Sequence, residues 1–250
     1  MSKEKIRSAA LANPNRFLKF SNILQPWICS VSLICITIGV IWGLFYSPPD
    51  WQQGDAVRIM YIHVPMALLS SVGYFLLALC ALCSLVWKHP LADLAAEEIG
   101  PIGGIATLLC LITGSLWGKP MWGTWWVWDA RLTSVLILLF FYIGHITLMH
   151  AFDDIQKGYK AAAYLALIGV FDLPIIKFSV YWWNTLHQTD TFKFTSNPPI
   201  VMTMIWPLLF CLIGFGLGFL ALILSRVKSA ILEHQFNRIV KIQLYNSNLL

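Results

Sequence analysis

Charged side chains are scarce in this 250-residue sequence. Asp, Glu, Lys and Arg together make up 12% of the residues, whereas an ordinary soluble domain is about one quarter charged. Hydrophobic residues reach 58%, and the mean hydropathy is +0.70. So few charged side chains cannot cover the surface of a water-soluble domain of this length. The composition therefore argues against a soluble enzyme, a disordered chain and a nucleic-acid-binding domain, and it predicts a polytopic membrane protein.

Two other features are missing, a phosphate-binding loop and a signal peptide, and a third, a C-x-x-C pattern, is present in an unusual place. The sequence has no G-x-x-x-x-G-K-[ST] loop, so any ATP hydrolysis must come from a partner. The basic segment 3–19 has no long apolar core, so we do not expect a cleavable signal peptide there. The C-x-x-C pattern of Cys80 and Cys83 lies within a hydrophobic run, where cysteine usually behaves as a small apolar side chain rather than as a redox pair.

Six apolar stretches are long enough to cross a membrane, which takes about 20 residues of helix. The fifth is apolar apart from Asp172 and Lys177. The sequence therefore predicts an all-α, polytopic membrane protein, with six transmembrane helices in a single membrane domain over residues 1–250. An even number of spans places both termini on the same side. The predicted spans are approximately 27–46, 64–87, 100–117, 132–151, 161–180 and 200–225.

Basic residues are unequally divided between the two sides of this predicted bundle. The side that holds the termini has twelve of the 17 Lys and Arg residues, and the opposite side has five. By the positive-inside rule, both termini are expected to be cytoplasmic. The external face then consists of residues 46–62, 118–131 and 181–199, together with the adjoining helix ends.

Tryptophan is concentrated on this external face. An aromatic belt at the membrane interface needs only one or two such residues per helix end. A short segment with many indoles offers a flat apolar surface with N–H donors at its edges, which suits a planar aromatic ligand. We therefore favour a ligand-binding loop, predicted over 117–131, over a plain belt. It contains Trp117, Trp122, Trp125, Trp126 and Trp128.

Two histidines are expected at the same depth as this loop. His63 precedes a proline at the outer end of the second span, and His187 lies in the last external segment. Neutral imidazole is a good ligand for haem iron, and two imidazoles can fill both axial positions. We interpret the pair as a bis-histidine haem site. His145 and His150 lie in the inner half of the fourth span, where they either pack against another helix or assist the arrival of a ligand.

External cations are few, so partners for the haem propionates can be named. Arg58 and Arg131 are the main candidates and Lys119 is a weaker one, because guanidinium binds carboxylate in bidentate fashion. The alternative is that both arginines only lie at the membrane–water interface and bind no ligand. Asp129 is the last residue of the Trp segment. Its carboxylate either accepts hydrogen bonds from backbone N–H groups or pairs with an arginine. Asp172, in the fifth span, has no assigned role.

The motifs resemble those of one known family. The segment WGKPMWGTWWVWD at 117–129, followed by ARLT, is similar to the tryptophan-rich WWD signature of the haem-handling proteins of cytochrome c assembly. The segments YIHVP at 61–65 and WWNTLHQ at 182–188, with the length and six spans, resemble the CcmC family rather than its larger relatives. The resemblance covers nearly the whole chain.

This resemblance implies a function in System I cytochrome c biogenesis. Haem b would be held on the periplasmic face of the bacterial inner membrane between His63 and His187, with the WWD loop on the macrocycle. The protein would present haem to the chaperone CcmE, in a complex with CcmA, CcmB and CcmD, and no catalytic residue is assigned. Two alternatives stay open. One is a haem-b electron-transfer subunit that uses the same histidines, and the other is a transporter with a relay of Asp172, His145 and His150.

Overall fold

The structure is a computed structural model that describes residues 13–183, 185–187 and 201–247. In these ranges the chain is helical, without any β-strand, as the sequence predicts. Parts of the predicted external segment 181–199 and the ends of the chain lie outside the described residues. The helices are α2 (Pro14–Ile41), α3 (Met60–Trp87), α4 (Pro90–Trp122), α5 (Ala130–Met149), α6 (Ile155–Gly169), α7 (Asp172–Trp182) and α8 (Met202–Ser247), with the short turns η1 (Trp42–Tyr46) and η2 (Asp55–Ile59).

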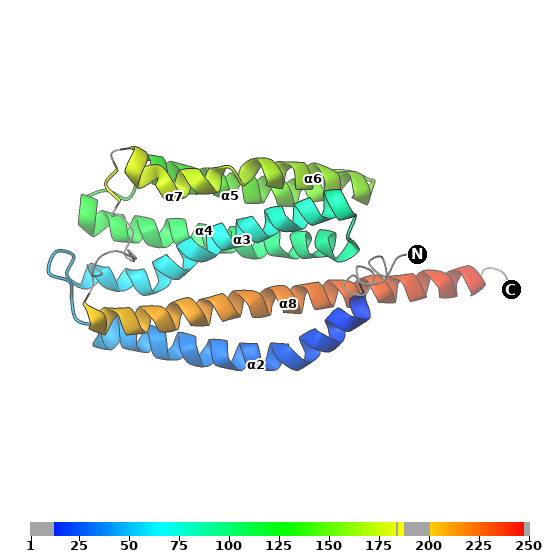
Figure 1. Cartoon of the computed structure of the whole chain (residues 1–250), viewed down its shortest axis with the longest axis horizontal. Coiled ribbons are helices and arrows are strands. Elements are labelled where there is room, and N and C mark those ends of the chain that lie inside the picture. Colours follow the sequence, from blue (N-terminus) through cyan, green and yellow to red (C-terminus); the bar gives the residue numbers. More distant parts are fainter. Residues whose placement is uncertain (1–12, 184, 188–200, 248–250) are drawn as a thin grey trace.

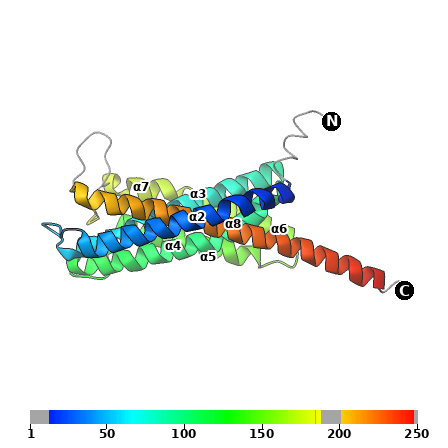
Figure 2. The same cartoon turned by 90° about the horizontal axis from the view of Figure 1, so that it is seen from below.

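Six helical segments are long and apolar enough to cross a membrane, counted over the described ranges, which confirms the predicted fold class. They run along a common axis and alternate in direction (Figure 1). We call the end formed by residues 42–60, 117–130, 182–183 and 185–187 the Trp end, and the opposite end the basic end. The first turn of α2 and the last turns of α8 both lie at the basic end (Figures 1 and 2).

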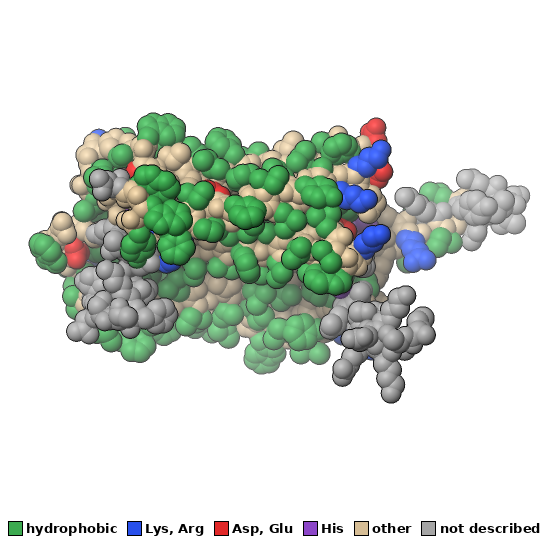
Figure 3. Space-filling view, turned by 45° about the horizontal axis from the view of Figure 1, so that its top comes forward, with side chains coloured by type: hydrophobic (Ala, Val, Ile, Leu, Met, Phe, Trp, Pro, Cys, Tyr) green, Lys and Arg blue, Asp and Glu red, His purple; other side chains and the backbone are tan. Residues whose placement is uncertain are grey.

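The surface has the pattern expected of a membrane-embedded bundle. Hydrophobic side chains cover the length of the helices, and Lys and Arg side chains gather mainly at the basic end (Figure 3). Exposed aliphatic and aromatic residues, such as Leu33, Phe75 and Phe140, are therefore suited to contact lipid. The basic end is the one that the positive-inside rule assigns to the cytoplasm, and this orientation stays a prediction.

Helices α2 and α8 pack along each other through small residues. Ser32 of α2 is buried and its Oγ donates to the carbonyl oxygen of Gly214 at 2.8 Å. A Cβ atom at Gly214 would lie 2.7 Å from the backbone nitrogen of Ile36, so only glycine permits this approach. In lipid, where apolar side chains gain little by leaving the solvent, such close backbone contact and interhelical hydrogen bonds drive helix association.

The main core lies between α3, α4, α5 and α6. Tyr74 and Tyr142 are fully buried, with ring centroids 5.0 Å apart, and the hydroxyl of Tyr142 donates to the Ser70 carbonyl at 2.8 Å. His145 is also buried, and its Nδ1 lies 3.1 Å from the carbonyl oxygen of Ala162 on α6. This contact is compatible with the first of the two alternatives predicted for His145, a packing residue held by a hydrogen bond.

The helices differ from the predicted spans at several points, and α2 and α4 already begin at Pro14 and Pro90. The fifth span is divided between α6 and α7. Pro174 has no backbone N–H to donate to the carbonyl of residue 170, four positions earlier, so a continuous helix is interrupted there. Asp172 consequently begins α7 instead of lying in the middle of a helix. Helix α8 does not end near residue 225 but continues to Ser247. Helix α4 continues to Trp122, so the predicted external loop 117–131 is reduced to residues 123–129.

Candidate functional site

His63 lies in the first turn of α3 at the Trp end and is 9% exposed. Its Nδ1 lies 3.1 Å from the carbonyl oxygen of Cys110 and 3.0 Å from the hydroxyl of Thr113, both on α4. A carbonyl oxygen can only accept, so Nδ1 carries the proton and Nε2 keeps its lone pair. Histidines that bind metals are commonly oriented in this way by a backbone carbonyl.

Two neighbours on α4 shape the space around this imidazole. A Cβ atom at Gly114 would lie 3.0 Å from Cε1 of His63, so the absence of a side chain there accommodates the ring. The Trp117 indole meets the His63 ring edge-on, with centroids 5.6 Å apart and planes at 87°. Nε1 of Trp117 donates to Oε1 of Gln53 at 2.9 Å, which ties the turn before η2 to α4.

His187 lies beside His63, in the segment that follows α7. The two ring centroids are 6.5 Å apart, with planes at 35°. The backbone N–H of His187 donates to the hydroxyl of Thr185 at 2.9 Å. Trp122, from the last turn of α4, has its ring centroid 6.4 Å from that of His187. The structure therefore brings together the two histidines that the sequence pairs, together with two of the five tryptophans.

The separation of the two rings fits a shared metal ion. A bond from an imidazole nitrogen to a first-row metal is about 2 Å long, and the nitrogen lies about 1 Å from the centre of its ring. Two imidazoles that bind one ion from opposite sides therefore have ring centres about 6 Å apart. The described residues contain no group of three or more His, Cys, Asp or Glu that could hold a metal ion. A two-histidine donor set suits a metal that brings its own equatorial ligands, as haem iron does.

Arg131, in the first turn of α5, connects this site to α7. Its Nη1 lies 3.3 Å from Nδ1 of His187, its Nη2 donates to the Lys177 carbonyl at 3.3 Å, and its Nε donates to the Ser179 hydroxyl at 3.4 Å. Arg131 was predicted as a propionate partner, and its position next to His187 is compatible with that role.

The other predicted cations are engaged away from the histidine pair. Nη2 of Arg58 lies 3.2 Å from a carboxylate oxygen of Asp55 and donates to the carbonyl of Ser47 at 3.1 Å. Lys119 donates to the carbonyl of Gly123 at 3.1 Å and lies 5.7 Å from the centre of the Trp125 ring. These contacts order the turns at the Trp end, and none of them reaches His63 or His187.

Asp129 is the N-cap of α5. Its Oδ1 accepts the backbone N–H of Leu132 at 2.7 Å, and the residue is 9% exposed. This is the backbone-capping role, the first of the two that the sequence leaves open. The cap sets where α5 begins and therefore where Arg131 is placed, two residues later.

The tryptophans form two groups rather than the single surface that the sequence predicts. Trp117 and Trp122 adjoin the histidines, whereas Trp125, Trp126 and Trp128 line a groove of about 570 Å³. The α4 residues of this groove, which include Leu108, Leu111, Ile112 and Ser115, are distinct from those around His63. Residues three or four apart share a helix face, so the groove lies on the opposite face of α4.

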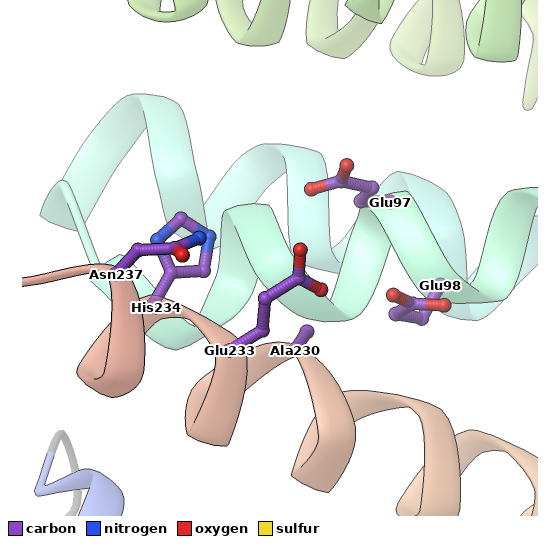
Figure 4. A pocket seen from close by; sticks show the side chains of 6 residues that line it. All are labelled: Glu97, Glu98, Ala230, Glu233, His234 and Asn237. Carbon is purple, nitrogen blue, oxygen red and sulfur yellow. The ribbon is translucent and has the colours of Figure 1, made fainter. Parts of the chain in front are cut away.

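A second hollow lies at the basic end, between α4 and α8 (Figure 4). It has a volume of about 180 Å³ and is lined by Glu97, Glu98, Ala230, Glu233, His234 and Asn237. Glu98 pairs with Nε of Arg226 at 2.7 Å, and Glu97 accepts a hydrogen bond from the Tyr159 hydroxyl at 2.9 Å. These contacts link α4 to α8 and to α6. The sequence did not indicate this hollow.

Sequence reasoning also missed the residues that orient the histidine pair. Gln53, Cys110, Thr113 and Gly114 belong to no motif, and Cys110 contributes only its backbone carbonyl. Their roles depend on the angular position of α4 relative to α3, which no spacing in the sequence reveals.

Together, the fold and the site define a polytopic helical membrane protein that holds two histidines and two tryptophans at one end of its bundle. Residues 7–241 match the family model CcmC, described as "Heme exporter protein C". The chain belongs to this family. It is 48% identical over 222 residues to "Heme exporter protein C" of Escherichia coli, covering 89% of each chain. Proteins of the same name from Bradyrhizobium diazoefficiens and Paracoccus denitrificans are 46% and 37% identical, covering 93% and 88% of this chain and 88% and 91% of theirs.

Proposed function

We propose that this protein binds haem b between His63 and His187 at the Trp end and presents it to the chaperone CcmE during cytochrome c maturation. The observation that carries the proposal is the separation of the two imidazole rings, 6.5 Å between centroids. The names of the relatives, each a haem exporter protein, support haem as the ligand. The haem supplies the iron for both imidazoles and the vinyl group to which the chaperone becomes attached.

The residues of this chain prepare the site before haem arrives. Cys110 and Thr113 hold the proton of His63 on Nδ1 and leave Nε2 available for the iron. The T-shaped contact with Trp117 restricts rotation of that ring. His63 and His187 would together hold the iron and leave no open position for oxygen chemistry, and the vinyl group could then be oriented toward a partner as a proximity effect.

The propionates need cationic partners at the same end of the bundle. Arg131 is proposed as the principal one, because its guanidinium already lies within 3.3 Å of His187. Arg58 is proposed as a second, since it precedes α3 by only two residues, although it first has to leave Asp55. The Asp55 side chain of this pair is exposed, and a guanidinium that exchanges a single contact of that kind for a bidentate propionate gains a stronger one.

The exposed tryptophans are proposed as the docking surface for the chaperone. Trp125 and Trp128 are 53% and 75% exposed at the Trp end of the bundle, and interfaces with partners are enriched in such residues. We place the protein in a complex with CcmA, CcmB and CcmD, in which CcmA hydrolyses ATP. We assign it to the bacterial inner membrane with the Trp end periplasmic, which is supported by the surplus of basic residues at the other end.

The transporter alternative receives little support from the structure. Of its three relay residues, His145 is bonded through Nδ1 to the Ala162 carbonyl, His150 is exposed at the end of α5, and Asp172 is buried in the first turn of α7. The electron-transfer alternative uses the same two histidines and differs only in its partners.

The proposal is tested with the full-length chain purified in detergent. His63→Ala and His187→Ala should each abolish the low-spin bis-histidine spectrum of bound haem, and the double variant should lose haem altogether. His150→Ala, at the opposite end of the bundle, is the matched control and should retain the spectrum. Haem retained with an unchanged spectrum in the double variant contradicts the proposal. Co-purification with a haem-carrying chaperone, rather than with respiratory subunits, separates the proposed function from electron transfer.

A further inference from the structure

The loop between α2 and α3 exposes one tryptophan almost completely. Trp51 is 91% exposed, and it is the most exposed of the twelve tryptophans. The loop, light blue in Figure 1, extends beyond the neighbouring helix ends at the Trp end of the bundle. We call residues 47–55 the Trp51 hairpin. Because the hairpin extends past the helices, its indole is accessible from the aqueous phase at that end.

Hydrogen bonds hold the tip of the Trp51 hairpin in one conformation. The N–H of Asp50 donates to the carbonyl of Gly54 at 3.1 Å, and the N–H of Gly54 donates to the carbonyl of Asp50 at 2.8 Å. Oδ1 of Asp50 accepts the backbone N–H groups of Gln52 and Gln53 at 2.9 and 2.8 Å. Gly54 has a φ of 55°, a conformation that favours glycine. An ordered turn therefore presents Trp51, which reduces the entropy that is lost when a partner binds it.

The base of the Trp51 hairpin is anchored in the bundle and connected to the histidine site. Ser47 is buried, and its Oγ accepts a hydrogen bond from the Tyr61 hydroxyl at 2.8 Å. Oε1 of Gln53 accepts a hydrogen bond from Nε1 of Trp117 at 2.9 Å, and the Trp117 indole meets the His63 ring edge-on. A short series of contacts thus joins the hairpin to the first of the two histidines.

The chemistry of the Trp51 hairpin fits a protein partner better than it fits lipid. The hairpin contains Asp50 and Asp55 but no Lys or Arg, and the Asp55 side chain is 76% exposed. Carboxylates repel anionic lipid headgroups, because like charges repel. Tryptophan is enriched in protein interfaces, where a few well-placed aromatic anchors supply most of the binding energy. The complementary surface is an apolar pocket edged by basic side chains.

We propose that the Trp51 hairpin is a docking surface for the protein that accepts haem, with Trp51 as the anchor that enters an apolar pocket of this partner. The inference rests on the proposed function and deepens it. It adds a contact at the end of the bundle to the contacts proposed for Trp125 and Trp128 on the side of α4. The link through Gln53 places the docked partner next to His63, where the haem is to be handed over.

The experiment measures how tightly the purified chaperone CcmE binds to the haem-loaded, full-length protein in detergent. Trp51→Ala should weaken this binding by at least about tenfold, the effect of removing an interface anchor. Haem affinity should stay within about twofold of the wild type and the bis-histidine spectrum should not change, which also shows that the variant is folded. Trp51→Phe keeps an aromatic ring and should retain most of the affinity. Trp87, 67% exposed at the basic end, provides the matched control Trp87→Ala, which should bind the chaperone as the wild type does.

A photoreactive benzoyl-phenylalanine placed at residue 51 identifies the occupant of this surface in intact membranes. A cross-link to CcmE, identified by mass spectrometry, is expected. A cross-link only to lipid or to a second copy of this chain overturns the proposal, as does equal affinity of Trp51→Ala and the wild type for the chaperone. Both results leave the haem site itself intact. Failure of the haem-loaded wild type to bind the chaperone overturns the proposed presentation of haem together with this inference.

Discussion

The imidazole rings of His63 and His187 lie 6.5 Å apart although the residues are separated by 124 positions in the sequence. His63 is placed by the first turn of α3, and His187 follows the end of α7 at the same end of the bundle. Arg131 links the second histidine to α5. Helix α4 supplies Cys110 and Thr113, which orient His63. The pair is therefore positioned by α3, α4, α5 and α7, and changes in any of them are expected to alter ligand binding.

Gly114 is expected to be essential for the position of His63. Gly114→Val should push the imidazole from its place and weaken haem binding by about tenfold or more, since its first added atom already falls 3.0 Å from the ring and overpacking costs about 1–3 kcal/mol. Haem titration of the purified variant measures the effect. Gly216, whose Cβ would meet nothing within 4 Å, provides the matched control Gly216→Val. Equal affinity in the two variants would contradict the structure.

The two groups of tryptophans are expected to have separable functions. Trp122→Ala should weaken haem binding, because that indole lies beside His187. The double variant Trp125→Ala, Trp128→Ala should bind haem normally but slow its transfer to the chaperone, because those side chains are exposed on the other face of α4. Haem titration and a transfer assay distinguish the two effects. If the double variant loses haem as readily as Trp122→Ala, the division into two groups has no functional meaning.

Asp129 is expected to stabilise the start of α5. Asp129→Ala should lower the stability of the protein by about 1 kcal/mol, the usual cost of losing an N-cap. Asp129→Asn keeps an oxygen that can accept from Leu132 and should lose much less. Thermal unfolding in detergent measures both variants, and equal losses would show that capping is not the role of this side chain.

The orientation in the membrane can be tested with single cysteines in a background that lacks the six native ones. Gln52→Cys, at the Trp end, should react with a membrane-impermeant thiol reagent added to the outside of intact cells or spheroplasts. Lys157→Cys, at the basic end, should react only after the membrane is permeabilised. The reverse pattern would place the site on the cytoplasmic side and would exclude presentation to a periplasmic chaperone.

The hydrogen bond between Tyr142 and Ser70 is expected to stabilise the core independently of any ligand. Tyr142→Phe removes the hydroxyl that donates to the Ser70 carbonyl in the interior of the bundle. The expected loss is about 1 kcal/mol of stability, because a single hydrogen bond has a modest net value within a membrane protein. Thermal unfolding should show this shift while haem affinity stays within about twofold of the wild type, since Tyr142 does not contact either histidine. A large loss of haem affinity would indicate that the core and the site are coupled.

The sequence by itself determined the properties that depend on local composition. Hydropathy and length predict six helices, and the spacing of those helices puts His63, His187 and the Trp segment at one end, because each span reverses the chain direction. The sequence did not predict where the helix breaks before Asp172, because a proline is compatible with more than one local structure. It also did not predict that α4 continues to Trp122, because a run of tryptophans is compatible with either a loop or a helix.

Tertiary structure decided which side chains share a face and which partners orient the imidazole of His63. The tryptophans were divided by the direction in which α4 presents its residues to α3 and α5, and His63 was oriented by the carbonyl of Cys110 and the hydroxyl of Thr113. These partners are distant in sequence from the histidine that they contact. Hydrogen bonding acts over about 3 Å in space, so only the packed arrangement of the helices can select among the partners that the sequence makes available.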